Sequence, residues 1–165
     1  MAVIDVVSGS ATETIRCRSG GVIEIPIDEV QVDDLLVGPS RESVLALAWS
    51  MALEPVSPFL VRQTIGAALP FELVFGRLRL LAMRELGRPT IPARGIACSS
   101  RTVRSIRSAE HAIRTGARHP DPVRAVAWLR KTFDLPISAL AEEFEKSIGW
   151  ITDALACSGK DEVDA

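Results

Sequence analysis

The stretch Phe71–Gly87, FELVFGRLRLLAMRELG, changes its periodicity at Gly76 and decides the fold. Alternating apolar residues predict a strand up to Gly76, and apolar residues at helical spacing predict a helix after it. The apolar face of that helix is expected to hold Leu78, Leu81, Ala82 and Leu86. Its more polar side is expected to hold Arg77, Arg79, Arg84 and Glu85. Gly87 is expected to end the helix.

The glycine between strand and helix makes the start of the helix a candidate anion site. The first N–H groups of a helix lack partners within the helix, and here they lie beside a residue without Cβ. A phosphate fits such a place, and Arg79 follows one turn later, where its guanidinium is close enough to clamp it. The alternative is an ordinary strand–turn–helix junction with solvated arginines, because one glycine is not a phosphate loop.

Size and composition bound the class of protein. The chain has 165 residues, 47% of them hydrophobic, which suits one domain or a compact domain with a small helical appendage. No apolar run approaches the ~20 residues of a membrane span, and the start lacks a signal-peptide pattern, so no membrane partner is expected. The cysteines are Cys17, Cys98 and Cys157, far apart and without metal-ligand spacing. We therefore expect reduced thiols and a cytoplasmic protein.

The net charge of −2 hides a basic middle. Between Leu73 and Lys131 the sequence has thirteen Arg or Lys residues against three acids, a local balance of +10. Such a segment in an acidic protein favours a polyanionic partner, a nucleotide or a nucleic acid. An arginine-rich solvated surface is the alternative.

The remaining pattern predicts an α+β fold, a small mixed sheet with helices on one side followed by an all-α helix-turn-helix segment. Further strands are expected at Gly21–Ile27, Phe59–Arg62 and Pro89–Ile96, and Pro26 favours an edge position for the first. Ser40 is the expected N-cap of a helix over Arg41–Leu53. The inward face of this helix is expected to be Val44, Leu45, Leu47, Ala48 and Met51. The expected divisions are a flexible arm (1–20), a sheet domain (21–98), a helical segment (99–157) and an acidic tail (158–165).

The helical segment holds the candidate DNA-binding residues. Short helices over Ser138–Phe144 and Ser147–Cys157, joined tightly after a helix over Val123–Phe133, are typical of a helix-turn-helix. The candidates on the second short helix and its turn are Lys146, Ser147, Trp150 and Thr152. Arg101, Arg104 and Arg107 recur every three residues and are expected to line one side of an earlier helix. The second short helix offers no arginine or asparagine for base edges, so direct base readout is expected to be thin.

These motifs together resemble the ParB N-terminal domain and its helix-turn-helix, over roughly Val22 to Ala156. FELVFGRLRLLAMRELGRPTIPA resembles the ParB segment with the GERR nucleotide box, and Gly76 and Arg79 match its glycine and last arginine. Glu110 to Arg114, EHAIR, resembles the ENxxR segment that closes over the phosphates. The FGGCHR box of sulfiredoxin is similar more loosely. The resemblance implies a member of the ParB/sulfiredoxin superfamily, either minimal or truncated, since the C-terminal dimerisation domain of partition ParB proteins is absent from this sequence.

The departures from the family concern the nucleotide site. Arg77 and Leu78 replace the glutamate and first arginine of GERR, and His111 replaces the asparagine of ENxxR. The cysteine of sulfiredoxin falls at Arg77, which excludes sulfiredoxin chemistry. Glu110 and Arg114 lie four residues apart, so a simple surface helix pair is the alternative for them.

The resemblance implies a nucleotide- and DNA-binding protein acting in plasmid or chromosome partition or plasmid maintenance, associated with the nucleoid or a plasmid. The implied ligands are a nucleoside triphosphate, CTP favoured and ATP as the alternative, with Mg²⁺, for which Glu110 is a possible ligand. The implied site residues are Gly76, Arg77, Arg79, Glu110, His111 and Arg114. Partners left open are a second copy in a homodimer and a protein of a partition or conjugation system.

Two other functions stay open. One is an enzyme of this fold, an NTPase (CTPase or ATPase), a nuclease or a small-molecule kinase, for example a plasmid-encoded inhibitor of conjugative transfer. Asp33 and Asp34 are then the candidates for general base or Mg²⁺ ligand, with a solvated turn as the alternative. The other is a DNA- or protein-binding module whose nucleotide site has decayed.

Overall fold

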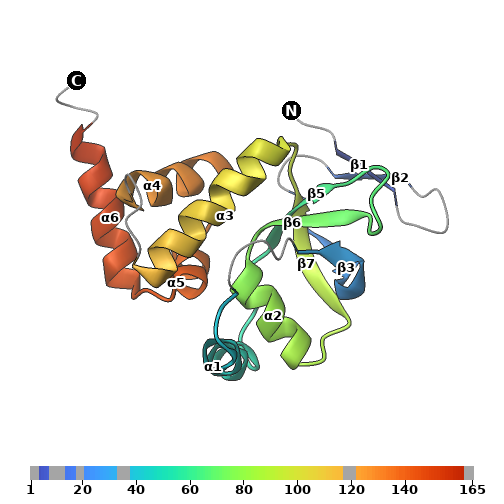
Figure 1. The fold of residues 1–165 in the computed structure, drawn as a ribbon, viewed down its shortest axis with the longest axis horizontal. Coiled ribbons are helices and arrows are strands. Elements are labelled where there is room, and N and C mark those ends of the chain that lie inside the picture. Colours follow the sequence, from blue (N-terminus) through green and yellow to red (C-terminus); the bar gives the residue numbers. More distant parts are fainter. Residues whose placement is uncertain (1–3, 8–13, 18–20, 33–37, 117–121, 162–165) are drawn as a thin grey trace. The chain divides into compact units, whose positions relative to one another are not determined.

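The computed structural model describes residues 4–7, 14–17, 21–32, 38–116 and 122–161 (Figure 1). The chain divides into two compact units, Met1–Arg104 and Ser105–Ala165. The division falls inside helix α3 (Ser100–Thr115) and not at residue 99, where the character of the sequence changes.

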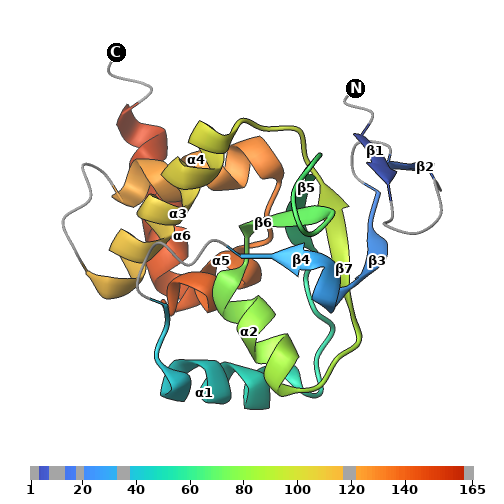
Figure 2. The same ribbon diagram turned by 45° about the vertical axis from the view of Figure 1, so that its right-hand side comes forward.

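A five-stranded mixed sheet forms the centre of the first unit, where the sequence predicts a small mixed sheet of four strands. Its strands lie in the order β3-β7-β5-β6-β4, with β3–β7 and β5–β6 antiparallel and β5–β7 and β4–β6 parallel (Figure 2). The strands are β3 (Ile23–Pro26), β4 (Val30–Gln31), β5 (Phe59–Gln63), β6 (Phe71–Phe75) and β7 (Thr90–Gly95). The edge position that Pro26 indicates for β3 is confirmed, because a missing amide hydrogen is tolerated there. The other edge strand, β4, follows a 3₁₀ turn (Ile27–Glu29) and has no counterpart in the sequence-based expectation.

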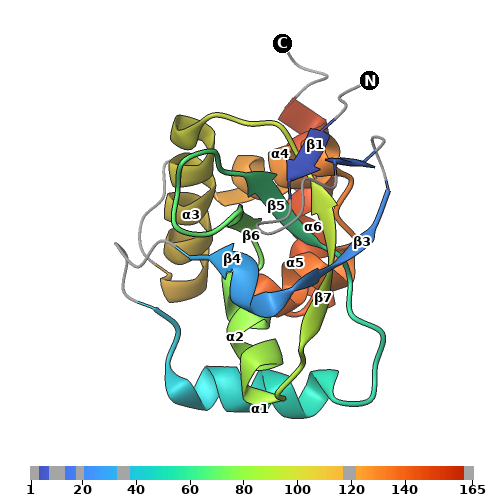
Figure 3. The ribbon, with the colours of Figure 1, turned by 90° about the vertical axis from the view of Figure 1, so that its right-hand side faces the viewer.

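Helices α1 (Arg41–Met51) and α2 (Arg77–Glu85) pack together and contribute to one core with the sheet (Figure 3). The core joins residues from both helices to those of one sheet face, including Ala48, Met51, Leu80, Phe71 and Ile91. The predicted cap is confirmed, since the Ser43 amide donates to the Ser40 hydroxyl oxygen at 3.1 Å.

Two expected positions on these helices are wrong. Leu45 is exposed, although the spacing places it on the inward face of α1. Arg79 is fully buried, although its charge places it on the polar side of α2. Leu80 and Met83, which lie outside the expected apolar stripe, are buried too, so the buried part of α2 is wider than that stripe.

The N-terminal region contains more structure than the arm expected for residues 1–20. Strands β1 (Ile4–Val7) and β2 (Thr14–Cys17) pair antiparallel in a separate two-stranded sheet.

In the second unit, α3 is followed by α4 (Pro122–Phe133), α5 (Ile137–Phe144) and α6 (Ile148–Asp161). Three residues join α5 to α6, and the first, Glu145, has a left-handed backbone (φ 54°) that ends α5. The amide of Lys146 then donates to the carbonyl of Ala141 at 3.0 Å, which tightens the turn. Within the described residues, six helices and a mixed sheet confirm the α+β class.

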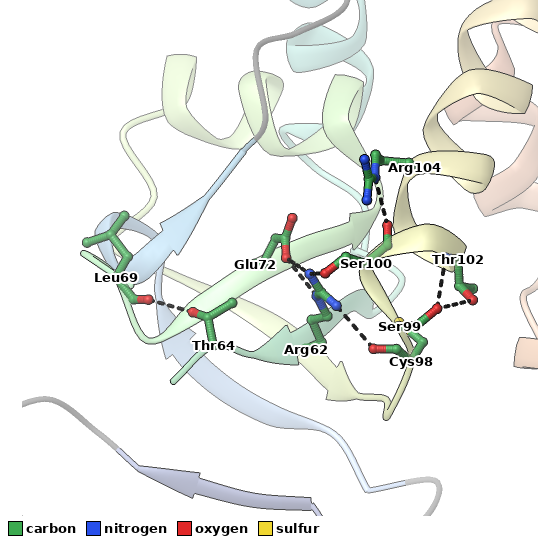
Figure 4. A network of polar contacts seen from close by, with 9 residues as sticks. All are labelled: Arg62, Thr64, Leu69, Glu72, Cys98, Ser99, Ser100, Thr102 and Arg104. Atoms are coloured by element: carbon green, nitrogen blue, oxygen red, sulfur yellow. Dashed lines mark hydrogen bonds and ion pairs between the residues drawn. The ribbon is translucent and has the colours of Figure 1, made fainter. Parts of the chain in front are cut away.

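A mostly buried ion pair fastens the start of α3 to the sheet (Figure 4). Nε and Nη2 of Arg62 on β5 lie 2.6 and 2.5 Å from Oε2 of Glu72 on β6. The same guanidinium donates to the Cys98 carbonyl at 3.1 Å and to the Ser100 hydroxyl at 3.0 Å. Ser99 caps α3 by accepting from the Thr102 amide at 3.2 Å. Arg62 therefore links two strands and the segment that leads into α3.

We expect Glu72→Ala to lower the free energy of unfolding by about 3 kcal/mol, because it leaves a mostly buried guanidinium without its carboxylate. Arg41→Ala is the control, since it breaks the Arg41–Glu85 pair (3.0 Å), in which the Arg41 side chain is 75% exposed. For that pair we expect a loss below about 1 kcal/mol. Urea unfolding followed by circular dichroism measures both. Equal losses in the two variants would contradict the role of Arg62 as a fastening point.

Candidate nucleotide and nucleic-acid sites

Gly76 occupies a backbone position that only glycine fits. Its φ is +113°, and a Cβ built on it would lie 2.8 Å from Cδ1 of Phe59. It is also the N-cap of α2 and has no side chain with which to cap the helix. The predicted strand–glycine–helix junction is confirmed, and the beginning of α2 carries no acidic residue to balance the helix dipole.

Arg79 is built into the interior of the protein (0% exposed). Its guanidinium carbon lies 4.6 Å from the ring centre of Phe59 and 5.9 Å from that of Phe75, within range of cation–π attraction. Its Nη1 donates to the carbonyl of Ser57 at 2.9 Å. Arg79 therefore ties α2 to β5, β6 and the segment before β5. Its assignment to a phosphate stays a prediction.

Arg77 is the partly exposed arginine at the start of α2. One of its terminal nitrogens, Nη2, lies 3.2 Å from the point that a Cβ on Gly38 would occupy, so the side chain runs along the segment before α1. A cation in the first turn of a helix is unfavourable beside the positive end of the dipole. A bound anion would relieve this, and of the two arginines only Arg77 is partly exposed, so its assignment to a phosphate stays a prediction.

Glu110 is buried in the second unit, so the alternative of a surface pair with Arg114 is wrong. Glu143 on α5 is buried as well. Burial raises the pKa of Glu110 well above its usual range, the nearby Glu143 charge and a hydrogen bond to Glu143 raise it further, and Arg114 and Arg107 oppose the shift. The buried surroundings and the Glu143 carboxyl thus favour the neutral form of Glu110. A carboxyl group that is harder to ionise is a weaker Mg²⁺ ligand.

The other two candidate residues of the EHAIR segment, Arg114 and His111, differ in their contacts. Nε of Arg114 lies 3.9 Å from Oε2 of Glu145, the residue that ends α5. His111 is half-buried, and its Nδ1 has no hydrogen-bond partner in the part of the chain that the structure describes. Arg114 thus pairs with the α5–α6 turn.

The Glu110→Gln variant tests the burial of Glu110 through the pH dependence of the protein's stability. Since the pKa of Glu110 is raised in the folded protein, the folded state binds more protons than the unfolded one. Stability is therefore expected to fall as pH rises above the usual glutamate range. Glutamine keeps the shape and cannot ionise, so the variant should be as stable as the wild type near pH 4.5 and more stable near pH 8. Urea unfolding at several pH values measures this, with Glu54→Gln on an exposed carboxylate as control. A variant less stable than the wild type at high pH would contradict the assignment.

The three arginines spaced along α3 do not form one exposed row. Arg101 and Arg104 are exposed, whereas Arg107 is buried. The expected basic face of α3 is therefore reduced to two arginines. The helix turns by about 100° per residue, so each step of three residues falls about 60° short of a full turn. After two such steps the side chain of Arg107 lies on the buried side of α3.

The start of α6 presents a compact polar group. Ser147 caps the helix by accepting from the Trp150 amide at 3.0 Å, and Nζ of Lys146 lies 5.7 Å from the Trp150 ring centre. Ser147 and Thr152 are exposed, and Lys146 and Trp150 are half-buried. The Thr152 hydroxyl donates to the carbonyl of Ile148 at 2.9 Å and has only acceptor capacity left for a ligand.

The polar start of α6 also includes an apolar residue that the sequence reasoning missed. Ile148 is exposed. Its position directly after the capping serine could have indicated that it lies at the exposed start of α6.

Asp33 and Asp34, the candidates for a general base or a Mg²⁺ ligand, lie outside the residues that the structure describes. Among the residues described, no group of three or more His, Cys, Asp or Glu side chains is placed to hold a metal ion. No helix in the described ranges is long and apolar enough to cross a membrane.

The two sets of candidate phosphate ligands belong to different units. Gly76, Arg77 and Arg79 lie in the first unit and Glu110, His111 and Arg114 in the second. Their convergence on one polyphosphate stays a prediction.

Comparison with known proteins bears on the fold. No protein-family model matches the chain, and no curated protein matches it. Among solved structures it is similar to a C-terminally truncated chromosome-partitioning protein ParB from Caulobacter crescentus complexed to the centromeric parS site. The TM-score is 0.55 and the identity 18%, over 81% of this chain and 70% of that one.

Two further structures are similar at lower TM-scores. One is the C-terminally truncated Caulobacter crescentus ParB complexed with CTP-γ-S, with a TM-score of 0.48 and 21% identity over 82% of this chain and 77% of that one. The other is sulfiredoxin from Arabidopsis thaliana, with a TM-score of 0.42 and 22% identity over 52% of this chain and 94% of that one.

The resemblance that the GRLR and EHAIR segments indicate is thus confirmed at the level of the fold. The chain has a ParB-like fold.

Proposed function

We propose that this chain is a ParB-like DNA-binding protein that also binds a nucleotide, and that it acts in plasmid or chromosome partition or plasmid maintenance. One observation carries the proposal. The α5–α6 pair, joined by three residues, presents the polar first turn of its second helix, in a fold similar to that of a ParB complexed to parS.

The α5–α6 pair fits the role of a helix-turn-helix. In such motifs the N-terminal residues of the second helix contact bases in the major groove. Here that turn carries the N-terminal end of the α6 dipole, the Lys146 ammonium group and the Ser147 hydroxyl, which together favour a phosphate. No arginine or asparagine stands there for base edges, so contacts to the DNA backbone and DNA shape dominate recognition.

The start of α2 is the proposed phosphate-binding part of the nucleotide site. Gly76 brings the backbone close to any ligand, the first turn contains no acid, and Arg77 adds a partly exposed guanidinium group. CTP is the favoured ligand and ATP the alternative, with Mg²⁺ bound through the phosphates.

Lys146→Ala is expected to weaken binding to a mixed-sequence duplex several-fold and to reduce the salt dependence of binding by about one phosphate contact. Fluorescence anisotropy of a labelled duplex over a range of salt concentrations measures both. Lys131→Ala removes the same charge from an exposed position on α4 and is the matched control. If the two variants bind DNA equally well, α6 is not the DNA-binding helix.

The nucleotide is tested by thermal unfolding with each of the four nucleoside triphosphates, with and without Mg²⁺. At about ten times its Kd, the bound nucleotide should raise Tm by roughly 4 °C. Arg77→Ala should reduce this shift, while Arg84→Ala, at the other end of α2, should keep it. Arg79→Ala is unsuitable, because truncating a buried side chain destabilises the protein whatever it binds.

The same experiment separates the remaining possibilities. A Tm unchanged by every triphosphate selects a DNA-binding module with a decayed nucleotide site. Release of inorganic phosphate from CTP or ATP in the stabilised samples indicates an NTPase.

A further inference from the structure

The outward face of α6 offers methyl groups and no cation between Ile148 and Cys157. Ile151 and Ala154 are buried, and the exposed residues recur with the helical period on the opposite side. Ile148, in the first turn, is 59% exposed. The exposed residues of this segment are Ile148, Gly149, Thr152, Asp153, Ala156 and Cys157.

The methyl group of Thr152 lies on the same side of the helix as Ile148. The Thr152 hydroxyl donates to the carbonyl of Ile148 at 2.9 Å, so the polar end of this side chain is turned towards the helix backbone and its methyl group is left for an apolar partner. Residues four apart share a face of a helix and are separated by about 6 Å along its axis. Ile148 and Thr152 therefore form an apolar pair on the outward face of α6.

Gly149 has no explanation within the chain. Its φ is not among the positive values that favour glycine. A Cβ built on it would meet nothing closer than Oγ of Ser147 at 3.8 Å, which is an ordinary contact. Glycine is a poor helix former, so alanine would suit this position better if only the fold mattered. A glycine is expected where another molecule approaches the backbone closely, and Gly149 lies directly beside the exposed Ile148.

Given the proposed function, on which this inference rests, we propose that Ile148 and Thr152 contact the C5-methyl groups of thymines in the major groove of duplex DNA. Thymine presents a methyl group in that groove, and apolar side chains are its usual partners. A separation of about 6 Å along the helix corresponds to roughly two base-pair steps of ~3.4 Å. The pair therefore fits thymines that are one or two base pairs apart.

The charges around this face favour base edges over phosphates as its partner. Asp153 is the one charged residue on the face between Ile148 and Cys157. Its carboxylate is repelled by phosphates, whereas in the major groove it can accept from the N4 amino group of a cytosine. The cation, Lys146, lies before the first turn of α6. A phosphate contact at Lys146 and base contacts on the face of α6 match the general division between contacts that position a protein on DNA and contacts that specify sequence.

Replacing thymine by uracil tests the proposal, because uracil pairs in the same way and lacks the methyl group. Duplexes that bind the full chain are first selected from a random-sequence pool, and each thymine of the selected duplex is then replaced by uracil in turn. At two positions, one or two base pairs apart, the replacement should lower affinity about fourfold each, as expected for one buried methyl group. Fluorescence anisotropy at one fixed salt concentration measures the affinities.

Variants assign each of the two positions to a side chain. Ile148→Ala should abolish the effect of uracil at one position, and Thr152→Ser, which keeps the hydroxyl and loses the methyl, at the other. Ile65→Ala removes an equally apolar and exposed side chain from the loop between β5 and β6, and it should show both uracil effects as the wild type does.

Two results overturn the proposal while leaving DNA binding in place. One is an affinity that no uracil replacement changes, and the other is a uracil effect that persists in full in both Ile148→Ala and Thr152→Ser. Failure of the full chain to bind any duplex overturns the proposed function as well.

Gly149→Ala tests the close approach of DNA to the first turn of α6. Alanine favours the helix, so Tm should rise or stay the same. The added methyl group projects towards the DNA, so affinity for the selected duplex should fall at least several-fold. Unchanged affinity in this variant contradicts the approach of the first turn to the bases.

Discussion

The guanidinium of Arg79, held against the rings of Phe59 and Phe75, is the constraint on which the first unit depends. Burying a charge costs several kcal/mol unless other groups offset it. Here two aromatic faces and the Ser57 carbonyl contribute to that compensation. Because these partners come from β5, β6 and the segment before β5, one side chain fixes how α2 begins above the sheet.

Two residues that match the family's nucleotide-binding segments, Arg79 and Glu110, are buried in this protein. A residue that matches an arginine of a nucleotide box serves here as an internal tie, and Glu110 of the EHAIR segment is buried beside Glu143, which raises the pKa of Glu110. The same residue types therefore support packing in each unit, and in the proposed function the phosphate ligand at the start of α2 is Arg77. Arg114 connects α3 to the turn between α5 and α6, the pair proposed to meet DNA.

Local signals predicted much of the fold. The change of period at Gly76, the cap at Ser40 and the edge position of Pro26 each depend on residues within a few positions, and each is confirmed. Strand β4 could not be found in this way, since two residues show no alternation. The burial of Arg79 contradicts its polarity, and only the apolar residues on either side of it hinted at an interior position. The approach of Glu110 to Glu143 joins helices thirty-three positions apart in the chain, a distance at which a single sequence carries no pairing signal.

The close approach at Gly76 links Gly76 and Arg79, at the start of α2, to Phe59 on β5. A smaller side chain at residue 59 would remove one of the contacts that exclude a Cβ at residue 76, but the φ of +113° would still favour glycine there, and the aromatic face beside Arg79 would be lost. Neither change is therefore neutral alone. In evolutionary terms, residues 59, 76 and 79 form one unit of substitution, and chains that diverge from this one should exchange all three together or keep all three.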